Sequence, residues 1–224
     1  MMERLPITLL IGAPGTNGHK IYNRITNDTQ DTRVTAIAPW PRSKSTQAQG
    51  KMTFVRTTER LKRLGQGCAC CTVRGDILSR VRQIIGDDTT DRLMIQVAPQ
   101  SDLDVLSKTF SVADDNGEVL GEVAVVDSVV TIVDGSNMLD ALKTDAAQRL
   151  IDMVRNSYTV WIDGFEGLSS QVKNEIKGAL SVMNPNARVV HGDDGAIKFS
   201  GFGEENTTAP STIDPQACDI DGGL

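Results

Sequence analysis

The sequence of 224 residues has few aromatic side chains, which make up 4% of it, and only two histidines. With so few aromatic rings, there is little surface on which nucleic-acid bases could stack. The formal net charge of −6 also gives the chain no general attraction to the phosphates of nucleic acid. We therefore expect no nucleic-acid partner.

Long hydrophobic runs are also missing, because no stretch approaches the ~20 consecutive apolar residues of a membrane-spanning helix. The first residues, MMERLPITLLIGAPG, lack the charged segment and cleavage site of a signal peptide, and their apolar run leads straight into a glycine turn. We predict a cytoplasmic protein with no membrane partner. Thiols stay reduced there, so clustered cysteines favour metal or redox chemistry over a structural disulfide.

Apolar runs typical of buried strands alternate with amphipathic helical patterns along most of the chain. Strands are expected at 7–14, 33–40, 91–98, 121–135, 158–164 and 187–192. Helices are expected at 19–28, 57–65, 72–88, 101–111, 136–156 and 169–184. The alternation predicts an α/β fold of three layers, in which helices cover both faces of a mainly parallel sheet. We expect one domain over 1–200 and an acidic, disordered tail over 201–224.

A glycine-rich loop, GAPGTNGHK, follows the first expected strand and leads into a helix. Backbone N–H groups and a helix N-terminus at such a turn commonly bind phosphate. The phosphate-loop pattern G-x-x-x-x-G-K-[S/T] is broken here, because Asn17, Gly18 and His19 replace its second glycine, its lysine and its hydroxyl residue. The candidate nucleotide-binding residues of this loop are Gly12, Gly15, Asn17, Gly18, His19 and Lys20. The alternative is a loop that only turns the chain.

Three of the four cysteines lie within the stretch GQGCACCTVRGD, as Cys68, Cys70 and Cys71. Thiolates are soft ligands that suit Zn²⁺, Co²⁺ or Cu(I). Three of them leave a tetrahedral ion with one open position, which suits a site that hands its metal on. Water, a carboxylate, His19 or a thiolate of a second chain could fill that position. Two alternatives are a buried apolar role for the thiols and redox cycling.

These segments together resemble the CobW-like branch of the metallochaperone GTPases, which includes the UreG and HypB types. The strongest match is QGCACCTVRGDIL (66–78), which fits the family motif G-C-x-C-C followed by T-[LV]-R and an acidic residue. Further matches are DSVVTIVDG (127–135), ALSVMNPNARVV (179–190) and GAPGTNGHKIYNRI (12–25). The resemblance covers about 5–192 and implies a sheet of the P-loop NTPase type. From this resemblance we expect no counterpart of the family's C-terminal domain in the chain.

Every nucleotide-handling motif departs from the family pattern. Besides the altered phosphate loop, Gln96, near the end of the 91–98 strand, stands where the family has an acidic residue. The guanine-reading N-K-x-D is replaced by Asp163-Gly164-Phe165-Glu166, in which Asp163 and Glu166 remain candidate nucleotide-binding residues. The segment APWPRSKST also lacks the family's acidic residues. Together these changes imply that Mg²⁺-dependent GTP hydrolysis is impaired, and we predict no catalytic residue.

The resemblance leaves three functions open. The first is a metallochaperone that holds Zn²⁺ or a similar ion at the cysteines and delivers it to a metalloprotein client. The second is a divergent GTP-binding protein or GTPase that serves metallocentre assembly. The third is a pseudo-GTPase that pairs with an active relative of the family. Formation of a homodimer is expected by resemblance to other members.

Overall fold

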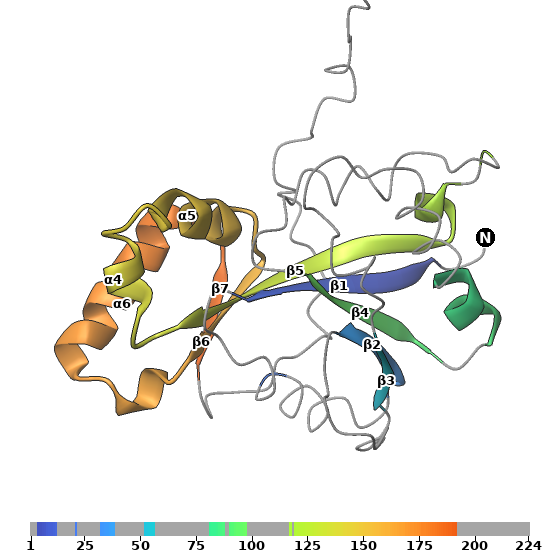
Figure 1. Ribbon diagram of the computed structural model, residues 1–224, viewed down its shortest axis with the longest axis horizontal. Coiled ribbons are helices and arrows are strands. Elements are labelled where there is room, and N and C mark those ends of the chain that lie inside the picture. Colours follow the sequence, from blue (N-terminus) through green and yellow to red (C-terminus); the bar gives the residue numbers. More distant parts are fainter. Residues whose placement is uncertain are drawn as a thin grey trace, which may run out of the picture.

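The computed structural model describes residues 4–12, 21, 32–38, 52–56, 81–87, 90–97, 117 and 119–191, with the backbone alone for 52–56. Its centre is a parallel sheet of seven strands in the order β3-β2-β4-β1-β5-β6-β7 (Figure 1). The strands are β1 (Leu5–Gly12), β2 (Val34–Ala38), β3 (Met52–Arg56), β4 (Arg92–Val97), β5 (Ala124–Asp134), β6 (Thr159–Asp163) and β7 (Arg188–His191).

The sheet confirms the predicted α/β class, because every pair of neighbouring strands runs parallel. All six strands expected from the sequence are present; β1 begins and ends two residues before its expected range, and the other five are shorter than expected. The prediction missed β3, which pairs with β2 at one edge of the sheet as far as the structure describes it. Its sequence MTFVR carries β-branched and aromatic residues, but a single edge strand of five residues gives too short a pattern to stand out.

Among the described residues, the helices gather mainly beside the last three strands. They are α4 (Met138–Ala141), α5 (Ala147–Arg155) and α6 (Ser170–Met183), with 3₁₀ turns η2 (Leu120–Glu122) and η3 (Phe165–Gly167). Figure 1 shows α4, α5 and α6 together at the end of the molecule that contains β6 and β7. A further helical segment, residues 81–86, lies within the predicted helix 72–88.

The prediction of one helix over 136–156 was wrong, because the structure divides it into α4 and α5. The break is at Thr144, whose hydroxyl donates to the carbonyl of Ala141 and accepts from the backbone N–H of Ala146. Such a side chain offers the backbone an alternative to the helical ladder. The predicted helices 57–65 and 101–111, most of 19–28, and the tail 201–224 lie outside the described residues.

Both faces of the sheet are buried under apolar side chains. One face packs residues of β1 and β4 against the helical segment 81–86, and continues into a cluster under α4, α5 and α6. On the other face, Trp161 of β6 and Met94 of β4 belong to a cluster that includes Ile21, which is helical. None of the helices among the described residues is long and apolar enough to span a membrane.

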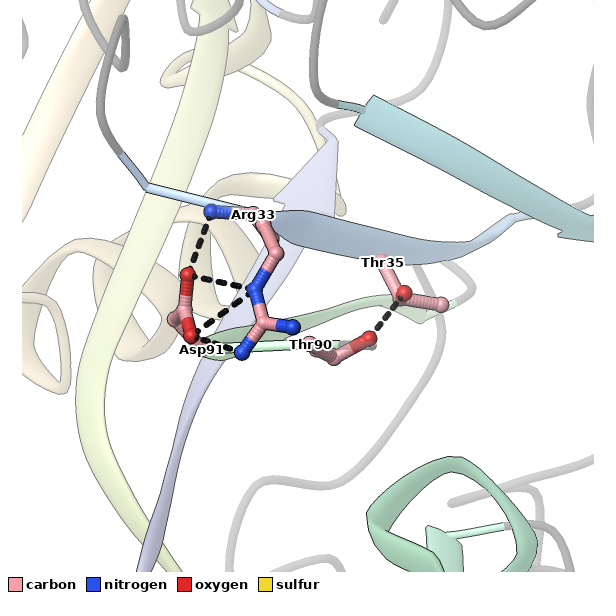
Figure 2. A network of polar contacts seen from close by, with 4 residues as sticks. All are labelled: Arg33, Thr35, Thr90 and Asp91. Atoms are coloured by element: carbon pink, nitrogen blue, oxygen red, sulfur yellow. Dashed lines mark hydrogen bonds and ion pairs between the residues drawn. The ribbon is translucent and has the colours of Figure 1, made fainter. Parts of the chain in front are cut away.

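Polar pairs join strands in the half of the sheet that contains the amino ends of the strands, called here the amino-terminal half. Figure 2 shows the carboxylate of Asp91 facing both the guanidinium and the backbone N–H of Arg33, while the hydroxyls of Thr35 and Thr90 share a hydrogen bond. Nearby, the guanidinium of Arg92 donates two 2.8 Å hydrogen bonds to the carboxylate of Asp127. Asp127 falls at an irregularity in the β1–β5 register, so this pair fixes the point where the register shifts.

Candidate functional site

The carboxyl ends of the parallel strands meet at one edge of the sheet, where ligands of open α/β folds usually bind. Gly12 ends β1 at this edge and is buried, and the register pairs it with Ile132 of β5. Two residues later β5 ends at Asp134, which lies in register with Asp163 at the end of β6. His191 ends β7 beside them, paired with the residue before Asp163.

Of the candidate nucleotide-binding residues, the structure therefore places Gly12, Asp163 and Glu166 along this edge, since Glu166 belongs to η3 directly after β6. Two strand spacings separate the ends of β1 and β6, or about 10 Å. The rest of the predicted site lies outside the described residues: Gly15, Asn17, Gly18, His19, Lys20, and the predicted metal ligands Cys68, Cys70 and Cys71.

The turn between β5 and α4 is organised by the carboxylate of Asp134. It accepts hydrogen bonds from the backbone N–H and hydroxyl of Ser136, at 2.9 and 2.6 Å, and from the side-chain amide of Asn137 at 2.6 Å. Partial burial on its own would raise the pKa of Asp134, but these hydrogen bonds outweigh it and lower the pKa below its ordinary value. The carboxylate therefore stabilises the turn in its ionised form.

This turn is packed directly against the end of β6. The backbone N–H of Gly135 donates to the carbonyl of Asp163 at 2.8 Å. A Cβ atom at position 135 would lie 3.0 Å from Ile162 Cγ2, 3.1 Å from that carbonyl and 3.1 Å from Leu168 Cδ1. Only glycine fits such an approach without displacement of its neighbours. The turns after β5 and β6 are therefore joined.

The turn after β6 contains the residues that replace the guanine-reading motif. Gly164 has φ 72°, a left-handed conformation that side chains other than glycine rarely adopt. The next residue, Phe165, is buried in the cluster under α6. The Lys173 ammonium, from α6, donates to the carbonyl of Glu166 at 2.9 Å. The backbone that carries Glu166 is thus held on both sides.

The roles of two residues at this turn, Phe165 and His191, were not predicted from the sequence. The ring of His191 stacks on that of Phe165, with centroids 4.2 Å apart and an angle of 29° between the planes. His191 Nδ1 also lies 3.7 Å from Oε1 of Glu166, an ion-pair distance when the imidazole is protonated. The available signal was that His191 and Asp163 each lie near the end of an expected strand, and that these two strands follow one another in the chain.

The described residues at this edge include an accessible carboxylate. No group of three or more His, Cys, Asp or Glu residues in the described part of the chain could hold a metal ion. Glu166 presents a carboxylate that is about half exposed, and a carboxylate accepts hydrogen bonds from the N–H groups of a base. The metal ligands expected from the sequence are the three cysteines, and their thiolate chemistry fits a soft ion.

Comparison with known proteins identifies the family of the chain. The nucleotide-binding domain of the CobW/HypB/UreG family matches residues 7–191. A curated relative, the zinc-regulated GTPase metalloprotein activator 1 of Dictyostelium discoideum, is 24% identical over an alignment of 223 residues that covers 87% of this chain and 47% of the relative. The chain therefore spans about half the length of that relative.

Two solved structures share the fold. Zn(II)-bound YjiA GTPase from E. coli superposes with a TM-score of 0.64 and 16% identity, over 89% of this chain and 61% of that one. FtsY from Mycoplasma mycoides gives a TM-score of 0.54 at 14% identity, over 84% and 60%. The seven-stranded parallel sheet is thus that of a P-loop NTPase-like domain. Within this class, the chain belongs to the CobW/HypB/UreG family, as its motifs predict.

Proposed function

We propose that the protein is a CobW-family metallochaperone that holds one Zn²⁺, or a similar soft ion, at Cys68, Cys70 and Cys71 and transfers it to a metalloprotein client. The observation that carries the proposal is three thiols within four residues in a chain of this family. Three thiolates leave an open coordination position through which a client's ligand can attack the ion. The protein is expected in the cytoplasm, with a homodimer as its assembly by resemblance to other members of the family.

The names of its relatives agree with this role. The Dictyostelium protein is a zinc-regulated GTPase that activates a metalloprotein, and the structure of YjiA contains Zn(II). Because the present chain spans only part of each, the transfer of zinc is a proposal for this protein. The chemistry of the thiolates supports it independently, since they prefer soft ions over Mg²⁺.

GTP hydrolysis is proposed to be impaired. Gln96 of β4 pairs in register with Leu10, two residues before Gly12, in the position where the family has an acidic residue. A neutral amide compensates Mg²⁺ less well than a carboxylate. At the end of β6, Gly164 offers no ammonium group, and Asp163 brings a negative charge where the family has a neutral amide.

The test measures metal content and free thiols on the full chain, purified without oxygen and loaded with Zn²⁺. About one ion per chain is expected, with three of the four thiols protected from alkylation. Cys70→Ser should reduce the bound zinc to near zero at the same free Zn²⁺ concentration. Cys218→Ser, outside the cluster, is the matched control and should retain the ion. Four reactive thiols in the zinc-loaded protein would contradict the proposal.

A divergent GTP-binding function is the second candidate, and the exposed carboxylate of Glu166 at the end of β6 favours it. A bound nucleotide raises the melting temperature of the protein that binds it. GTP with Mg²⁺ should therefore raise the melting temperature of the full chain. An unchanged melting temperature at millimolar nucleotide would contradict this candidate and leave the zinc site untouched.

A further inference from the structure

The turn that carries Glu166 is built to hold its backbone in one place. Gly164 supplies the left-handed bend, and Phe165, 3% exposed, anchors the turn in the core. The ammonium groups of Lys173 and Lys177 lie 5.6 and 5.4 Å from the centroid of the Phe165 ring. Lys173 also binds the carbonyl of Glu166. The freedom that remains to Glu166 is largely that of its side chain.

His191 limits that remaining freedom. Its side chain is 18% exposed and is supported from one face by the Phe165 ring, whereas the side chain of Glu166 is 54% exposed. The imidazole is therefore the fixed partner and the carboxylate the adjustable one. Because 3.7 Å is too long for a hydrogen bond and exposed ion pairs add little stability, the contact contributes mainly orientation.

We propose that His191 is a positioning residue for Glu166, which it orients to accept from the edge of a purine with two adjacent N–H groups. The inference rests on the nucleotide-binding candidate of the proposed function. The two oxygens of Glu166 accept from the ring N–H and the exocyclic amine of guanine, and each such bond is charge-assisted. His191 does not touch the base in this arrangement. It acts through the carboxylate.

The experiment compares the affinities of the full chain for GDP and for inosine diphosphate, which lacks the exocyclic amine, both with Mg²⁺. One lost bond to a charged acceptor predicts that GDP binds about tenfold more tightly than inosine diphosphate. Glu166→Gln should reduce this ratio to about one. His191→Phe keeps an aromatic ring against Phe165 but removes Nδ1, so the ratio should fall several-fold. The affinity for inosine diphosphate should fall less than that for GDP, because only its ring N–H bonds to Glu166.

The matched control is Glu175→Gln on α6, an exposed carboxylate that accepts from Gln171 and should leave the ratio unchanged. Equal affinities of the unaltered protein for the two nucleotides would overturn the inference but not nucleotide binding. A normal ratio in His191→Phe, or an equal loss of affinity for both nucleotides, would overturn the role of His191. Binding of neither nucleotide would overturn the inference and the nucleotide-binding candidate together, with the zinc proposal tested separately.

Discussion

Charged side chains form different kinds of contact at the amino ends and at the carboxyl ends of the parallel strands. In the amino-terminal half, Arg92 and Asp127 are joined through two 2.8 Å hydrogen bonds, and the Arg33–Asp91 pair is 2.6 Å apart. At the carboxyl edge, Glu166 and His191 stand 3.7 Å apart on neighbouring elements. Close, multiply bonded pairs hold strands in register, whereas a carboxylate that is oriented but not saturated can still accept from a ligand.

Asp134 qualifies this contrast, because it lies at the carboxyl edge and yet is saturated. Its partners are a backbone N–H, a hydroxyl and an amide, all within the next three residues, rather than a guanidinium from another strand. It therefore fixes a local turn, and through Gly135 it steadies the turn that carries Glu166. The carboxyl edge thus combines a fixed support with an accessible acceptor.

The largest expected effect is on the amino-terminal half. Asp127→Ala leaves the guanidinium of Arg92, whose side chain is 9% exposed, without its carboxylate. The loss of one partner of a buried pair should lower the free energy of unfolding by about 3 kcal/mol, measured by urea denaturation. The double variant Arg92→Met with Asp127→Leu removes both charges and should recover much of the loss. No recovery would mean that the ion pair makes a net contribution to stability that the two apolar side chains cannot replace.

A smaller effect is expected where the two carboxyl-edge turns meet. Gly135→Ala places a methyl group 3.0 Å from Ile162 Cγ2 and 3.1 Å from the carbonyl of Asp163. The overpacking should cost about 1 to 2 kcal/mol in urea denaturation. Gly178→Ala on α6 is the matched control, because a Cβ there meets nothing within 4 Å. It should stabilise the protein by about 0.5 to 1 kcal/mol. Equal effects at both positions would contradict the close packing of Gly135 against Ile162 and Asp163.

The sequence predicts the sheet well because each of its main strands is a continuous apolar run bounded by polar or glycine residues. The strongest run became β5, the longest strand described. The exceptions are local: β3 is short and at an edge, and the Thr144 hydroxyl interrupts a helix whose amphipathic pattern is continuous. Periodicity records which side of an element is buried, but not where one polar side chain breaks the backbone ladder.

The candidate site was predicted only in part. Asp163 and Glu166 were found because they occupy the positions of a family motif that is contiguous in sequence. Phe165 and His191 were not, because their contact depends on the pairing of β6 with β7 and joins residues 26 positions apart. A single histidine at the end of a strand has no motif around it. The folded structure is needed to show that its imidazole lies beside the carboxylate of Glu166.

The smallest expected effect concerns the ionised carboxylate of Asp134. Its pKa in the folded protein lies below the ordinary value of 3.8, so its stabilisation is fully present above that value and is lost as pH falls through the folded-state pKa. Asp134→Ala should therefore lower the free energy of unfolding by about 1 kcal/mol at pH 7 and at pH 5. The gap between the two proteins should narrow below pH 3.8, as urea denaturation at successive pH values can show. Asp140→Ala, which removes an exposed pair with Lys143, should change stability by less than about 0.5 kcal/mol. A gap for Asp134 that widens in acid would mean that the neutral carboxyl group stabilises the turn, and that this edge of the sheet is not supported by charge.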